Sequence, residues 1–130
     1  MAVVATPIFA QAPRHAAVAI STANTNRDGS GTIGTVFTAD ATDGSGLTRI
    51  DICATGNTTA GVVRLFIHNG STYFLWREIL VGALTVSTTV AAFMRRIDLS
   101  PDLPLPAGWS LRAATHNAET FHVHAFGYDF

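Results

Sequence analysis

The chain has 130 residues, a formal net charge of −1 and 48% apolar residues, while only 13% of its residues are charged. This length fits one domain, and the charge excludes a basic field for nucleic acid or for an anionic membrane surface. We expect no membrane span, because no apolar run reaches the roughly 18 residues required. An average domain has about 25% charged residues, so part of this surface is expected to be covered by a partner, unless the many threonines solvate it instead.

The first 14 residues are predicted to form an extended arm, because they contain Pro7 and Pro13 and show no core periodicity. Export is not expected, since no basic residue precedes the small-residue run at 10–12 and Pro7 interrupts the apolar stretch. The apolar side chains of the arm are unfavourable in water and are predicted to dock on a neighbouring subunit. They are Val3, Val4, Ile8 and Phe9.

Residues 15–130 are predicted to form a single all-β domain, because short stretches rich in β-branched residues alternate with turn clusters. Antiparallel strands with short connections predict a two-sheet sandwich, most simply a jelly roll of about eight strands, whose order the sequence leaves open. The expected strands are 16–22, 32–39, 47–55, 61–68, 71–80, 87–98, 108–116 and 121–129, with a loop at 101–108.

The dipeptide Asn69-Gly70 predicts a two-residue hairpin of type I′, in which both central residues have a positive φ. In this register His68 lies opposite Ser71 and Arg64 opposite Leu75. One face is then apolar and is predicted to be core: Val63, Leu65, Ile67, Thr72, Phe74 and Trp76. The other face has the composition of an interface centre, and a second buried layer, or Arg stems that cover exposed rings, is an equal alternative. Its residues are Arg64, Phe66, His68, Tyr73, Leu75 and Arg77.

A second hairpin is expected to join 110–116 to 121–130, with Thr115 and Ala113 opposite His122 and His124. The two histidines share one strand face, which is a spacing compatible with a metal. A third ligand is missing, because His116 falls on the opposite face. Solvated or interface histidines are therefore the favoured interpretation.

Other candidate sites also favour a non-catalytic interpretation. The run Asn24-x-Asn26-x-Asp28 imitates a calcium loop, but Thr35 stands where the template needs a bidentate Glu, so a plain turn is favoured. Cys53 is predicted to be a small buried hydrophobe. Since no nucleophile elbow, phosphate loop or carboxylate pair is present either, we expect no enzyme, metal or cofactor.

Four runs of the sequence resemble small proteins encoded in the head gene clusters of tailed phages and prophages. They are TANTNRDGSGT at 22–32, AGVVRLFIHNG at 60–70, LRAATHNAE at 111–119 and GYDF at 127–130. The resemblance covers most of the chain after residue 15, and its motifs are structural turns and strands. It implies a capsid decoration (cement) protein of jelly-roll type that binds the outside of an HK97-like shell.

The resemblance implies a non-enzymatic virion protein that stabilises the shell by bridging capsid subunits, without nucleic-acid or membrane partners. Its expected partners are the major capsid protein and itself, as a dimer or trimer. It would be made in the host bacterial cytoplasm and end on the capsid surface. The alternative is a carbohydrate-binding jelly roll, or a head-spike or tail component, for host attachment. That alternative is motivated by aromatic residues on which sugars could stack: Tyr73, Trp76, Trp109 and Tyr128.

Overall fold

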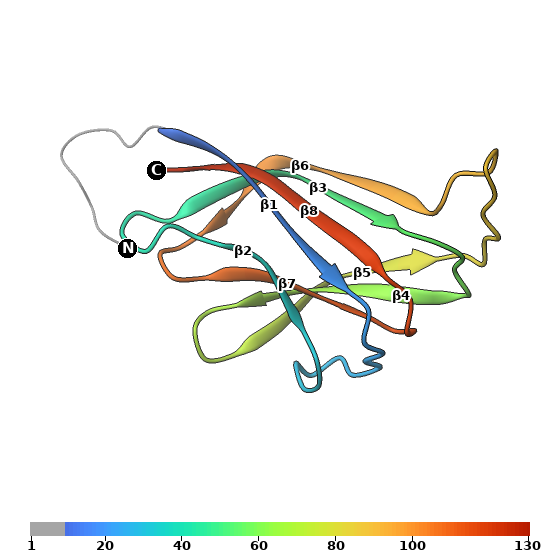
Figure 1. Ribbon diagram of the computed structural model, residues 1–130. Coiled ribbons are helices and arrows are strands. Elements are labelled where there is room, and N and C mark those ends of the chain that lie inside the picture. The colour runs from blue at the N-terminus through green and yellow to red at the C-terminus, as the bar shows by residue number, and fades with distance from the viewer. Residues whose placement is uncertain (1–9) are drawn as a thin grey trace.

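The computed structural model describes residues 10–130, which form two facing antiparallel sheets of four strands each (Figure 1). Successive strands are divided between the sheets in the jelly-roll order, which confirms the predicted fold class. One sheet runs β1 (Ala12–Ile20), β8 (Phe121–Asp129), β3 (Ser45–Ala54), β6 (Met94–Leu105). The other runs β2 (Gly34–Thr38), β7 (Ser110–Thr115), β4 (Gly61–His68), β5 (Tyr73–Val81). No helix among these residues is long and apolar enough to cross a membrane.

The core lies between the sheets and follows from alternation along the strands. Val63, Leu65 and Ile67 of β4 are buried there as predicted. In β8, Phe121, Val123 and Ala125 are buried as well, while the residues between them face outward. Full burial of a large aliphatic side chain contributes about 1.5–3 kcal/mol, and the central strands supply most such residues. Those with at most 1% exposure include Leu47, Ile50, Ile52, Val63, Leu65 and Leu111.

The predicted arm is too long, because β1 begins at Ala12 rather than at residue 16. The strand pairs with β8 from Ala12 opposite Asp129 to Ile20 opposite Phe121. Pro13 is compatible with this strand because β1 lies at a sheet edge, where a missing N–H need not interrupt the ladder. Val3, Val4, Ile8 and Phe9 lie outside the described residues.

The strand β6 also differs from its prediction. It begins at Met94 and continues to Leu105 through Pro101 and Pro104, where a loop was expected. The reason is again its position, since β6 is the other edge strand of the first sheet and needs no donor on its free side.

The expected hairpin of β7 and β8 is wrong, because the two strands belong to opposite sheets. The segment 116–120 therefore crosses from one sheet to the other. His122 lies opposite Ala19 and Cys53, and His124 lies opposite Ala17 and Asp51. Local sequence cannot distinguish such a crossover from a hairpin, since both consist of two strands with a short connection.

The turn at Asn69-Gly70 is a four-residue loop and not a type I′ turn. Gly70 has a φ of 103°, but no described residue other than glycine has a positive φ. The side-chain oxygen of Asn69 instead accepts hydrogen bonds from the N–H groups of Ser71 and Thr72, at 3.0 and 2.8 Å. The longer loop changes the register, so that His68 pairs with Tyr73.

Candidate interaction surface

Two residues of the predicted interface face are buried within the chain itself. Arg64 is 2% exposed and Phe66 is fully buried, although both point away from the core. The connection between β1 and β2 contributes to this cover, since Nη1 of Arg64 donates to the carbonyl oxygen of Asn24 at 3.2 Å. Figure 1 shows this connection below the sheet. Arg64 and Phe66 therefore form a second buried layer, which was the alternative interpretation of this face.

The covering loop is stabilised by its own polar side chains. Nδ2 of Asn24 donates to the carbonyl oxygens of Ser30 and Thr32, at 2.9 and 3.0 Å. Oδ1 of Asp28 accepts from the backbone N–H and the hydroxyl of Ser30. These bonds account for the run that imitates a calcium loop, because its amide and carboxylate groups fix the backbone of the loop itself.

Glu78 of β5 joins the loop to the sheet. Its Oε1 accepts from Nε of Arg64 at 3.1 Å and also from Nε of Arg27 in the loop. The hydrogen bond from Arg27, together with that from Arg64, lowers the pKa of Glu78 below its ordinary value, although partial burial opposes the shift. Nδ1 of His116 lies 3.3 Å from Nη2 of Arg64, so the buried guanidinium has a polar neighbour on a second side.

The other predicted interface residues, Tyr73, Leu75 and Arg77, lie together on β5. Tyr73 is half-buried, and its hydroxyl accepts from Nη1 of Arg112 at 3.0 Å. Leu75 is 39% exposed. Arg77 is exposed, with its guanidinium 4.8 Å from the centre of the Trp76 ring. His68, the remaining residue of this face, is half-buried, with its ring centre 4.3 Å from that of Tyr73. Of the six candidates on this face, only Leu75 and Arg77 are therefore open to a partner.

The sequence prediction missed the most exposed apolar residues of this strand. Phe74, predicted to be core, is 49% exposed, and Leu80 is 72% exposed. Leu80 is exposed because of a bulge in β5: Phe66 pairs with Leu75 but Leu65 pairs with Arg77, which leaves Trp76 as an extra residue and turns Leu80 to the outer face. Phe74 stays on the inner face, opposite Ile67, and is exposed near the start of this edge strand. We call Phe74, Leu75 and Leu80 the apolar edge. The alternation of the sequence could not show this bulge.

The outer face of the first sheet is polar. Arg49 lies opposite Asp98 and Asp51 opposite Arg96, so the charges of β3 and β6 alternate in sign across the strands. In the strands beside them, Nε2 of His15 lies 2.8 Å from Nδ1 of His124. Within residues 10–130 no three His, Cys, Asp or Glu side chains are grouped closely enough to hold a metal ion.

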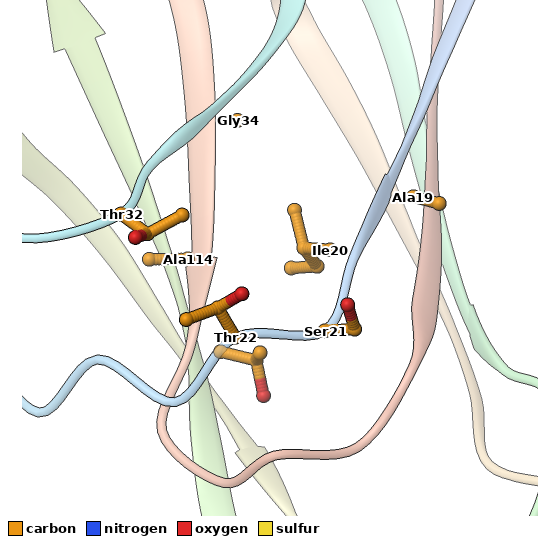
Figure 2. Close-up of a pocket in the computed structure, with 8 residues that line it drawn as sticks. Ala19, Ile20, Ser21, Thr22, Thr32, Gly34 and Ala114 are labelled. Carbon is orange, nitrogen blue, oxygen red and sulfur yellow. The ribbon is translucent and has the colours of Figure 1, made fainter.

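A small cavity lies between the end of β1, the start of β2 and β7 (Figure 2). Its volume is about 100 Å³ and its lining includes Ile20, Ala114 and the threonines 22, 32 and 115, without a charged side chain. Sites for small organic ligands usually measure about 300–1,000 Å³. The cavity therefore has room for a few water molecules rather than a sugar ring.

The aromatic residues that motivated a carbohydrate site do not gather on one surface. Trp76 and Trp109 are half-buried and pack against the core. The hydroxyl of Tyr128, on β8, donates to Oδ2 of Asp102 at 2.7 Å, and this bond raises the pKa of the tyrosine. No family model matches the chain, and the comparison with curated proteins gives no match either.

Proposed function

We propose that this chain is a non-enzymatic structural protein of a tailed-phage virion. It binds the outer surface of an HK97-like capsid and stabilises the shell by bridging capsid subunits. Its partners are the major capsid protein and further copies of itself. The shell is proposed to be a phage capsid because the runs at 22–32, 60–70, 111–119 and 127–130 resemble small proteins of phage head gene clusters.

The observation that carries the proposal is the apolar edge. Phe74, Leu75 and Leu80 are exposed on a sandwich with only 13% charged residues. All three lie along one free sheet edge, and exposed apolar side chains on such an edge offer a surface that another chain can cover. A repeating shell also gives such a protein many equivalent sites, so linked copies bind more tightly than their single contacts allow.

The test uses empty expanded shells assembled from the major capsid protein of the same gene cluster. Cryo-electron microscopy of shells with and without the purified protein should show added density at repeating positions on the outer surface. Decorated shells should also disrupt at a higher temperature than bare shells. Shells that remain bare at saturating protein concentration would contradict the proposal.

A further inference from the structure

The free edge of β5 differs from the other three sheet edges of the sandwich. β1 and β2 lie against each other across the gap between the sheets. β6 contains Pro101 and Pro104 and exposes several charged side chains. Prolines and charges of this kind prevent edge strands from pairing with other chains. Within the described part of the chain β5 pairs only with β4, it has no proline, and its exposed positions include Phe74, Leu75 and Leu80.

The bulge at Trp76 gives the two ends of this strand matching faces. Leu75 pairs with Phe66 and Leu80 pairs with Val62, and both partners lie on the outer face of β4. In a regular strand two residues separated by an odd number of positions point to opposite faces. Because the bulge inserts one residue between them, Leu75 and Leu80 share the outer face. Phe74 and Val81 share the inner face by the same argument, since they pair with Ile67 and Gly61.

We propose that β5 pairs antiparallel with β5 of a second copy, about a two-fold axis that passes between Arg77 and Glu78. This register places Leu75 of each copy opposite Leu80 of the other, on the outer face, and Phe74 opposite Val81 on the inner face. At the centre, Arg77 and Glu78 point to opposite faces, because they pair with Leu65 and Arg64 of β4, so the apolar pairs on either side determine the register. The two copies then share one continuous eight-stranded sheet.

Other registers of the same two strands are less favourable. A two-fold axis on Arg77 or on Glu78 puts like charges together and sets outer residues against inner ones. An axis between Trp76 and Arg77 matches the faces, but it places Leu75 opposite Glu78. Among these four axes, only the one between Arg77 and Glu78 pairs Leu75 with Leu80 and Phe74 with Val81.

The dimer is tested first by sedimentation of the purified protein over a range of concentrations. Wild type should change from monomer to dimer as its concentration rises, and Leu80→Glu should raise the dissociation constant of the dimer at least about tenfold. Met94→Glu is the matched control, because Met94 is 73% exposed but lies on β6. A wild type that stays monomeric at every concentration overturns the proposal. The proposal is also overturned if both variants weaken the dimer equally, or if neither variant weakens it.

The register is tested with single cysteines in a Cys53→Ser background. Leu75 of one copy lies opposite Leu80 of the other, at a spacing that suits a disulfide, whereas two copies of residue 75 lie about 17 Å apart. Mild oxidation should therefore cross-link a mixture of the Leu75→Cys and Leu80→Cys proteins, but neither protein alone. Equal cross-linking in all three samples, or none in the mixture, overturns this register. The inference does not rest on capsid binding, because both measurements use the purified protein alone.

Discussion

At the scale of single residues, the burial of Arg64 removes this side chain from the predicted interface face of β4 and β5. A guanidinium that is 2% exposed needs partners for its donors, and it finds Glu78 at 3.1 Å and the carbonyl of Asn24 at 3.2 Å. Both partners lie far from it in the sequence, one on β5 and one in the loop after β1. The side chain thereby joins three segments of the fold.

We expect Arg64→Ala to destabilise the protein by about 2–4 kcal/mol, because it removes buried packing and leaves the Asn24 carbonyl without its donor. Arg96→Ala is the matched control, since Arg96 and its partner Asp98 have side chains that are 63% and 70% exposed. An exposed pair of this kind contributes below about 1 kcal/mol. Urea unfolding of both variants measures the difference. Similar losses in the two variants would show that Arg64 has no special structural role.

The carboxyl group of Glu78 should make stability depend on pH in the acid range. Its pKa in the folded protein is lowered, mainly by the hydrogen bond from Arg27, from an ordinary value of 4.5. The stabilisation is therefore fully present above pH 4.5 and is lost as the pH falls through the lower folded pKa. Melting temperatures between pH 7 and pH 3 should fall more steeply for wild type than for Glu78→Gln. Parallel curves would contradict this assignment.

At the scale of elements, the number of strands and the core face of β4 could be predicted, because both depend on local alternation. The register of β5 could not, since it depends on a bulge at Trp76 and on a loop that Asn69 caps with its side chain. The separation of β7 from β8 and the contact of Arg64 with the loop after β1 depend on segments that are distant in the sequence. For this reason Leu75 and Arg77 of the predicted interface are exposed, whereas Arg64 and Phe66 are buried within the chain, and the prediction did not include Leu80.

The loop between β4 and β5 depends on the left-handed backbone of Gly70, whose φ is 103°. We expect Gly70→Val to destabilise the protein by about 1–3 kcal/mol, because a β-branched residue is strained at a positive φ. Gly70→Ala should show a smaller loss of the same sign. Gly82→Ala serves as control, since an added Cβ there has open space and the φ of Gly82 is not left-handed. Thermal melts compare the three variants, and a Gly70→Val protein as stable as wild type would show that the loop relaxes without strain.

At the scale of the whole molecule, the few charges are mostly engaged within the chain. All eight basic residues are arginines. Seven of them form ion pairs or lie over aromatic rings: Arg14, Arg27, Arg49, Arg64, Arg77, Arg96 and Arg112. Because the formal net charge is only −1, long-range repulsion between copies is weak. A low charge and an open apolar edge therefore act together in favour of association.

The proposed capsid contact assigns a separate role to the first residues of the chain. Removing residues 2–9 should leave the sandwich folded, because β1 begins at Ala12 and pairs along its whole length with β8. The removed apolar residues, Val3, Val4, Ile8 and Phe9, could contribute about 1.5–3 kcal/mol each when buried on a partner. Ordering the backbone costs about 1–2 kcal/mol per residue, so the two terms are comparable and the segment can bind only where the partner adds surface of its own.

We therefore expect the truncated protein to keep its melting temperature and its β spectrum but to decorate shells more weakly than wild type. Occupancy on purified shells, measured by co-sedimentation over a range of protein concentrations, gives the loss of affinity. The Leu80→Glu protein is examined beside it, because that change acts on the apolar edge and leaves residues 2–9 intact. Wild-type occupancy by the truncated protein, with an unchanged oligomeric state, would place the shell contact on the sandwich itself. The exposed residues of β5, Leu75 and Arg77 first, would then be the next positions to change.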